Sequence, residues 1–198
     1  MTELTAISLF SGAGGMDVGF AEAGFRITAA NEIDEDARET FRLAHRLGPL
    51  ADSIESEVTF RALTKHKDAS LIFGGPPCQG FSVAGKMDPH DPRSKLIWRF
   101  FDVVQAVKPR AFVCENVKAL GFNTRWASVR QALHAHAESL GYTTALLVLN
   151  ASRFGVPQAR ERMFLIGVNR EDVQFQHANR LQEAIWRSEE RRVGKECR

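Results

Sequence analysis

The sequence predicts an α/β fold in which a mostly parallel sheet carries helices on both faces. Short apolar runs typical of buried strands alternate along the chain with segments whose apolar residues recur at helical spacing. Clusters of glycine and proline separate these segments where strands and helices are expected to end. The length of 198 residues suits one such domain, and an apolar fraction of 44% with 25% charged residues is ordinary for a globular protein.

The expected elements follow one another in a regular order. Strands are expected at 6–10, 25–33, 69–73, 111–117, 142–150 and 162–168, with a further weak strand near 50–54. Helices are expected at 16–23, 34–47, 95–107 and 126–140. Asp34 can cap the second helix, and Gly24, Gly48 and Gly141 stand where helices end. The last two strands are close enough in sequence to pair.

Composition excludes several classes of protein. No apolar run approaches the roughly 18 residues of a membrane span. The N-terminus carries Glu3 and lacks the basic region of a secretory signal. Three cysteines do not make a disulfide scaffold, and the histidines show no metal-ligand spacing coupled to cysteines. We therefore expect a cytoplasmic protein with no membrane partner and no metal site.

The last twelve residues differ from the rest of the chain. Residues 187–198, RSEERRVGKECR, hold five basic and three acidic side chains, which account for the whole net charge of +2. Their text resembles a translated sequencing-library adapter, and the alternative is a natural charged helix end. We expect one domain over 1–186 and a non-native tail over 187–198. Net charge then carries no information about nucleic acid.

A glycine-rich loop follows the first expected strand. Gly12, Gly14 and Gly15 permit a tight turn and a close approach of a ligand, and the next helix offers its N-terminus to an anion. The spacing is not G-x-G-x-x-G, which disfavours a nicotinamide-dependent oxidoreductase, and a plain tight turn is the alternative. Glu32 ends the second strand, where Rossmann-like sites bind ribose hydroxyls, and an exposed capping charge is the alternative there.

Cys78 is the candidate nucleophile. It follows a strand in GGPPCQGFS, a polar, proline-stiffened context that suits an exposed thiol, whereas Cys114 lies in an apolar run and is expected to be buried and inert. A thiol with a pKa of about 8.5 needs local help to ionise at neutral pH.

Charged side chains near two further strand ends are candidate catalytic groups. Glu115 ends an otherwise apolar strand, so its carboxylate is solvated, paired or functional, and a raised pKa would suit a general acid. Gln158, Arg160 and Arg162 alternate, so an extended backbone turns them to one side. Two guanidiniums there can grip a phosphate or a base carbonyl, and a surface salt-bridge ladder with Glu161 is the alternative.

Six motifs in this order resemble those of the C5 cytosine DNA methyltransferases. They are SLFSGAGGMDVGF at 8–20, NEID at 31–34, GGPPCQGFS at 74–82, DPRSKL at 91–96, ENV at 115–117 and GVPQARER at 155–162. One such motif is weak evidence, whereas six in register are specific. The first motif often begins with Asp in the family, where this chain has Ser8.

The resemblance implies a Rossmann-like, S-adenosylmethionine-dependent methyltransferase fold, truncated at the C-terminus, with S-adenosylmethionine as methyl donor and no metal. It implies that the donor contacts Phe10, Ser11, Gly12, Gly14 and Gly15, with Glu32 on the ribose, Ile33, Asp52 and Ser53 at the adenine, and Pro77 and Leu96 closing the pocket.

The resemblance also implies the chemistry. Cys78 adds to C6 of a flipped-out cytosine, Glu115 protonates N3, and Arg162 supports the base and Glu115. Arg160 takes part in catalysis beside them. The remaining implied residues belong to the catalytic loop and to nucleic-acid contacts, and they are Gln79, Ser82, Asn116 and Gln158.

The sequence therefore predicts the catalytic part of a DNA cytosine-C5 methyltransferase, inactive as this fragment because the family's target-recognition region is absent after Val168. The expected partners are double-stranded DNA and a restriction endonuclease of the same system, and the chain is expected to be a monomer. The alternatives are a tRNA cytosine-C5 methyltransferase of the same architecture and a non-catalytic fragment that binds the donor or nucleic acid.

Overall fold

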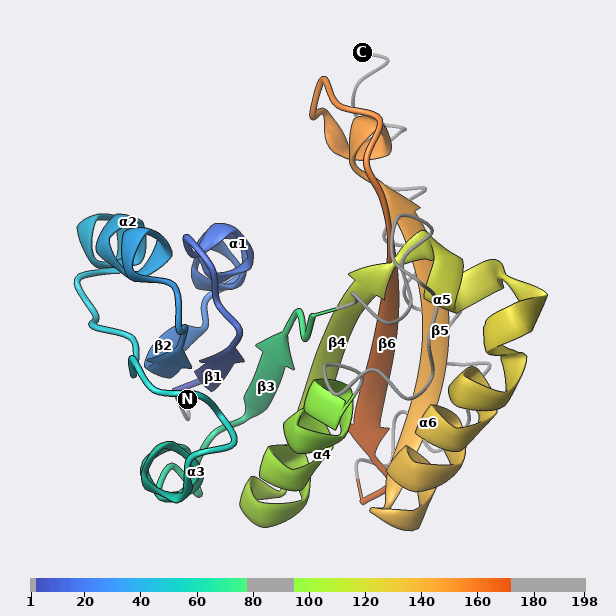
Figure 1. Cartoon of the computed structure of the whole chain (residues 1–198), viewed down its shortest axis with the longest axis horizontal. Coiled ribbons are helices and arrows are strands. Elements are labelled where there is room, and N and C mark those ends of the chain that lie inside the picture. The colour runs from blue at the N-terminus through green and yellow to red at the C-terminus, as the bar shows by residue number, and fades with distance from the viewer. Residues whose placement is uncertain (1–2, 78–94, 172–198) are drawn as a thin grey trace.

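The structure is a computed structural model that describes residues 3–77 and 95–171. Its strands form one six-stranded sheet in the order β2-β1-β3-β4-β6-β5 (Figure 1). The strands are β1 (Thr5–Leu9), β2 (Arg26–Asn31), β3 (Leu71–Gly74), β4 (Ala111–Val117), β5 (Tyr142–Asn150) and β6 (Glu161–Asn169). The α-helices are α1 (Gly15–Glu22), α2 (Glu35–His45), α3 (Glu57–Thr64), α4 (Lys95–Val107), α5 (Lys118–Phe122) and α6 (Ala127–Ser139), and the 3-10 turns are η2 (Thr124–Trp126) and η3 (Ala151–Phe154).

One strand of the sheet runs against the others. β1 pairs in parallel with β2 and β3, and β3 pairs in parallel with β4, whereas β6 is antiparallel to both of its neighbours, β4 and β5. The predicted mostly parallel sheet is confirmed. Because β6 is reversed, its first residues lie at the carboxyl-terminal edge of β4, where Arg162 stands opposite Val117. The segment before β6 therefore reaches the same edge as the glycine loop after β1.

Both faces of the sheet carry helices, as predicted. Alternate residues of a strand point to opposite faces. Ala6 and Phe73 face α1, where Met16 and Phe20 pack on them. The other face carries the larger core, in which strand residues such as Ile7 pack with side chains of α3, α4 and α6. Figure 1 shows α4 and α6 lying over β4, β6 and β5.

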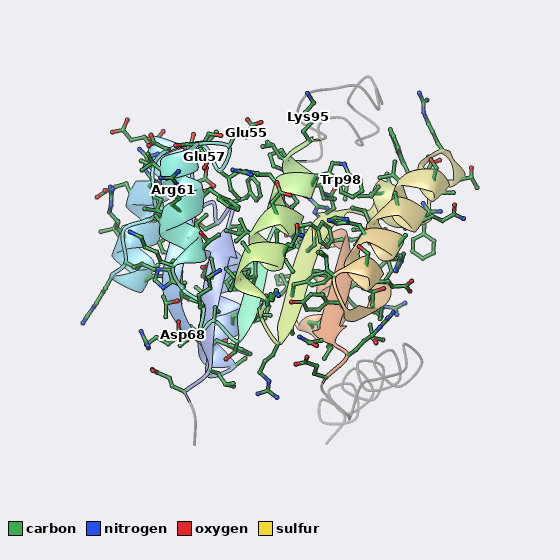
Figure 2. The ribbon with its side chains drawn as sticks, turned by 90° about the horizontal axis from the view of Figure 1, so that it is seen from below. Glu55, Glu57, Arg61, Asp68, Lys95 and Trp98 are labelled. Carbon is green, nitrogen blue, oxygen red and sulfur yellow. The ribbon has the colours of Figure 1, made fainter. Side chains whose placement is uncertain are left out.

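Two helices were not expected from the sequence. α5 has five residues directly after β4, and α3 has eight residues, too few to form a stable helix alone. Tertiary contacts support α3, since Leu63 is fully buried and Arg99 of α4 lies 4.2 Å above the Phe60 ring. Figure 2 shows Glu57 and Arg61 together on α3.

The weak strand expected near 50–54 is wrong, because only Leu50 pairs, in a single bridge to Asn31. Several element ends differ from expectation by one or two residues, and two of them bear on the site. β2 ends at Asn31 instead of residue 33, and α2 ends at His45 because Arg46 takes a left-handed conformation with φ 53°. These differences leave the carboxyl-terminal edge of the sheet as the place where the motifs gather.

Candidate active site

A cleft of about 550 Å³ opens at the carboxyl-terminal edge of the sheet. One wall comes from the end of β1 and the first turn of α1, and it includes Phe10, Ser11 and Gly15. The other wall holds Glu115 of β4 together with Arg160 and Arg162 at the start of β6. Small-molecule sites usually measure about 300–1,000 Å³. The cleft therefore brings the glycine loop and the acid–arginine motifs to one space of a suitable size.

Glu32 stabilises the glycine loop. One carboxylate oxygen accepts a hydrogen bond from the Gly12 N–H at 2.8 Å, and the other accepts one from the Asp34 N–H at 2.9 Å. The cap of α2 is Asp34, whose side chain accepts from the Ala37 N–H at 2.8 Å. Glu32 is therefore not the helix cap that the sequence left open. A carboxylate has four acceptor positions, so two remain for a ligand such as a ribose.

The neighbouring glycines Gly14 and Gly15 have different roles. Gly14 is buried with φ 87°, and a Cβ atom there would overlap the His45 ring and lie 2.9 Å from Cδ2 of Phe41. At Gly15 a Cβ atom would meet nothing within 4 Å. Gly14 is thus required where α2 packs on the loop, and Gly15 faces open space at the cleft. The donor contact expected of Gly14 stays a prediction.

Glu115 and Arg162 form an ion pair inside the cleft. Oε1 of Glu115 lies 3.0 Å from Nε of Arg162, with side chains 20% and 28% exposed. Burial raises the pKa of Glu115, although Arg162 and Arg160 act to lower it. A carboxyl group that keeps its proton to a higher pH suits a general acid.

Of the side chains near this ion pair in sequence, some line the cleft and others do not. Glu161 pairs with Lys118 at 2.7 Å, so it does not form the surface ladder considered as an alternative. Gln158 is exposed and does not line the cleft, so only Arg160 and Arg162 of the three alternating residues meet there.

Asn116 holds the segment that leads to the candidate nucleophile. Its buried side-chain amide donates to the Pro76 carbonyl at 3.1 Å, and its Oδ1 accepts from the Val117 N–H at 3.0 Å. Cys78, Gln79 and Ser82 lie outside the described residues. Asn116 therefore fixes the backbone two residues before Cys78.

Cys114 is the cysteine that the sequence expects to be inert. It is fully buried in β4, and this burial raises the pKa of its thiol. A buried thiol with a raised pKa is a poor nucleophile. The expected burial of Cys114 is confirmed, and its inertness stays a prediction.

The residues expected at the adenine gather beyond β2. The buried side chain of Asn31 donates to the carbonyls of Leu50 at 3.1 Å and Asp52 at 2.8 Å, which holds the 50–52 segment beside the end of β2. Ile33, Asp52 and Ser53 are exposed at this edge. Asn31 was missed from the sequence, and its signal is an amide inside the NEID motif that ends an apolar strand.

Pro77 and Leu96 do not line the cleft. Pro77 is half-buried, and Leu96 packs against the larger core from the first turn of α4. Their closing of the donor pocket stays a prediction.

Asp17 is a cleft residue that the sequence did not single out. It is fully buried in the first turn of α1 and lines the cleft beside Ser8 of β1. Its signal in the sequence is an acid three residues before Phe20, which puts both on the side of the helix that packs on the sheet.

With this geometry established, comparison with known proteins identifies the family. The sequence model of the C-5 cytosine-specific DNA methylases matches residues 4–195. The chain belongs to this family. The family match includes the glycine loop, the acid–arginine pair and the segment that carries Cys78.

Several curated relatives of this methylase chain come from bacteria. It is 40% identical over 178 residues to the Type II methyltransferase M.AquIA of Picosynechococcus sp., with 83% of this chain and 72% of that protein aligned. It is 37% identical to M.FnuDI of Fusobacterium nucleatum and 39% identical to M1.HphI of Haemophilus parahaemolyticus, again over 83% of this chain. The chain spans only 47% and 45% of these two proteins.

Solved structures support the Rossmann-like methyltransferase fold. A prophage-encoded protein of E. coli, described as a DNA modification methyltransferase, matches with a TM-score of 0.72 and 31% identity, covering 85% of this chain and 47% of that one. The Dnmt2 methyltransferase of S. pombe shares the fold, with a TM-score of 0.65 at 22% identity over 84% of this chain and 49% of that one.

Two further observations concern metal ligands and membrane-spanning helices. Within residues 3–77 and 95–171, no group of three or more potential metal ligands comes together. No helix in these same two ranges has the length and apolar character needed to cross a bilayer.

Proposed function

We propose that this chain is the N-terminal catalytic part of a DNA (cytosine-5-)-methyltransferase, which transfers a methyl group from S-adenosylmethionine to C5 of a flipped-out cytosine. The observation that carries the proposal is the half-buried ion pair of Glu115 and Arg162, which shares one cleft with the glycine loop. A proton donor and a nucleoside-sized space then lie within the same site. The Type II methyltransferase names of the bacterial relatives support DNA as the substrate.

The cleft suits the methyl donor. Gly15 leaves open space at the loop, and the volume of about 550 Å³ is adequate for a nucleoside with an amino-acid tail. Glu32 does not line the cleft, but it contacts the glycine loop through the Gly12 N–H and keeps free acceptor positions after β2. Phe10, Ser11, Gly12 and Glu32 would hold the donor from β1 and β2. When bound, S-adenosylmethionine supplies an electrophilic methyl group.

The residues of this chain perform the remaining steps. The Cys78 thiolate bonds to C6 of the cytosine, while Glu115 donates its proton to N3 and Arg162 stays against the carboxylate that forms. C5 thereby gains the electron density to take the methyl group, and S-adenosylhomocysteine is the leaving group. A base then removes the C5 proton, the C5–C6 double bond forms again as the Cys78 thiolate leaves, and N3 returns its proton to the Glu115 carboxylate. The target base must leave the duplex, which costs a few kcal/mol.

The test is a trapped covalent adduct on a fluorinated base. DNA carrying 5-fluorocytosine has no C5 proton to lose, so the bond from Cys78 to C6 persists after methylation. The chain should be joined to the C-terminal region of a Type II relative, since it spans less than half of two of them. We expect an adduct in denaturing gels that Cys78→Ala abolishes and Cys114→Ala retains.

Two outcomes would contradict this proposal. An adduct that survives Cys78→Ala would refute the nucleophile. An adduct with fluorinated tRNA in place of DNA would assign the chain to tRNA cytosine methylation.

The finer cellular assignments are part of the same proposal. We infer a monomer that acts in the cytoplasm. The Type II names of the relatives support a restriction endonuclease as its partner. Light scattering of the purified chain tests the monomer. The partner is tested by asking whether a neighbouring gene encodes an endonuclease and whether its product digests unmodified DNA.

A further inference from the structure

The cleft contains an acidic side chain that the proposed chemistry leaves unused. Asp17 has 0% exposure, and neither of its carboxylate oxygens has a hydrogen-bond partner. The hydroxyl of Ser8 is also 0% exposed and also lacks a partner. Both residues line the cleft, Asp17 from α1 and Ser8 from β1. Three oxygen atoms without a hydrogen-bond partner therefore lie at the same space.

An unpaired carboxylate at such a depth is costly to the fold. Burial raises the pKa of Asp17, and this effect outweighs the nearby Ser8 hydroxyl and His45, which both act to lower it. Native proteins pair buried charges or satisfy them with hydrogen bonds. A buried acid left without a partner at a ligand cleft is therefore well placed to receive a cation from the ligand.

The surroundings of Asp17 select the kind of cation. A divalent metal needs several ligands, and the part of the chain that the structure describes holds no cluster of three. The N-terminus of α1 begins at Gly14, which provides no side-chain cap, so its N–H groups attract an anion beside Asp17. An α-amino acid carries both charges, because its amino group has a pKa of about 8 and is protonated at neutral pH.

We propose that Asp17 and Ser8 accept hydrogen bonds from the α-ammonium group at the amino-acid end of the methyl donor. The inference rests on the proposed function, since that function supplies the donor. It adds a specificity element on α1 that distinguishes the complete donor from adenosine thioethers without an amino acid.

Two nucleoside ligands that differ in the amino-acid end provide the test. S-adenosylhomocysteine has the amino acid, and 5′-methylthioadenosine lacks it. Isothermal titration of the full 198-residue chain with each ligand gives four dissociation constants for the parent and Asp17→Asn. We expect Asp17→Asn to weaken S-adenosylhomocysteine about tenfold or more, the usual effect of losing a hydrogen bond to a charged group, and to leave methylthioadenosine within about twofold.

Two further variants complete the design. Ser8→Ala should weaken S-adenosylhomocysteine selectively and by less than Asp17→Asn does. Asp68→Asn is the matched control, because Asp68 is exposed at the amino-terminal edge of the sheet, opposite the cleft (Figure 2). It should leave both affinities unchanged. Methylthioadenosine binding by Asp17→Asn also reports that the variant is folded, and Ser8→Ala tests the site independently.

The outcomes separate this inference from the proposed function. A parent chain that binds neither nucleoside would overturn the donor site, and the inference with it. A parent chain that binds both, while Asp17→Asn and Ser8→Ala weaken neither or weaken both ligands equally, would overturn the inference alone.

Discussion

Opposing effects on single side chains set the chemistry of this site. Burial raises the pKa of Glu115 more than Arg162 and Arg160 lower it, which supports the proposed role of proton donor. The Arg162 guanidinium, at 3.0 Å, would stabilise the carboxylate that remains after proton transfer. The same burial at Cys114 suppresses the thiolate and leaves that cysteine inert.

Replacing Glu115 should slow catalysis without loss of the donor. Glu115→Gln keeps the size and hydrogen-bonding capacity of the side chain but cannot protonate N3. In the chain joined to a relative's C-terminal region, we expect a rate about 10²–10⁴-fold lower, the usual contribution of general acid catalysis. Single-turnover methyl transfer and titration with S-adenosylhomocysteine measure the two properties separately. A full-rate Glu115→Gln enzyme would exclude the acid role.

Asp17 should make the folded state less stable as pH rises. Because its pKa in the folded state is raised above 3.8, it binds its proton more tightly when folded. The stability from this group is present below pH 3.8 and is lost as pH rises through the raised pKa. Asp17→Asn cannot ionise. We therefore expect its free energy of unfolding to exceed that of the parent by at least about 1 kcal/mol at pH 8, and by less near pH 4. Urea unfolding of both chains at several pH values measures this difference, and a pH-independent difference would contradict it.

At the scale of elements, the stability lost by a substitution in the loop between β1 and α1 should depend on which glycine is changed. Gly14→Ala should destabilise the fold by about 2 kcal/mol or more, since φ is 87° and the added methyl group overlaps His45. Gly15→Ala is the matched control, because nothing lies within 4 Å of the added atom. Urea unfolding at neutral pH should place Gly15→Ala within about 1 kcal/mol of the parent. Equal losses in the two variants would refute the distinction.

The contact between β4 and the segment after β3 should control how fast Cys78 forms its adduct. Asn116→Ala removes the amide that holds the Pro76 carbonyl, and the unsatisfied buried carbonyl costs about 1–3 kcal/mol. We expect slower adduct formation on 5-fluorocytosine DNA, because the backbone before Cys78 loses its anchor. Methylthioadenosine affinity should stay the same. An unchanged adduct rate would assign Asn116 a purely structural role.

The sequence predicted most elements because strand and helix patterns are strong where apolar residues are periodic. It missed α3, which depends on burial of its own Leu63 and on Arg99 of α4 packing over its Phe60 ring. It also extended β2 into Glu32, whose carboxylate instead binds the Gly12 N–H. The motifs located Glu115 and Arg162 because their residue types are distinctive. Asp17 was not predicted, since no spacing rule shows that one acid of a short helix is fully buried beside a cleft.

At the scale of the whole molecule, this chain carries the proposed catalytic residues of a methylase. It spans less than half of the length of two of its relatives. Reading a DNA sequence requires side chains that reach base edges in a groove. Residues 1–186 are also electrically neutral, so attraction to phosphates depends on local patches alone.

We therefore expect the 198-residue chain to show no site-specific methylation, although it carries Cys78, Glu115 and Arg162. Incubation with labelled S-adenosylmethionine and mixed-sequence DNA tests this expectation. A separate polypeptide with the C-terminal region of a Type II relative should restore methyl transfer when added, because it supplies base-edge contacts to an acid–arginine pair that is already formed here. A Glu115→Gln chain with the same added polypeptide is the control and should stay inactive. Site-specific methylation by the 198-residue chain alone would show that sequence reading resides within these residues.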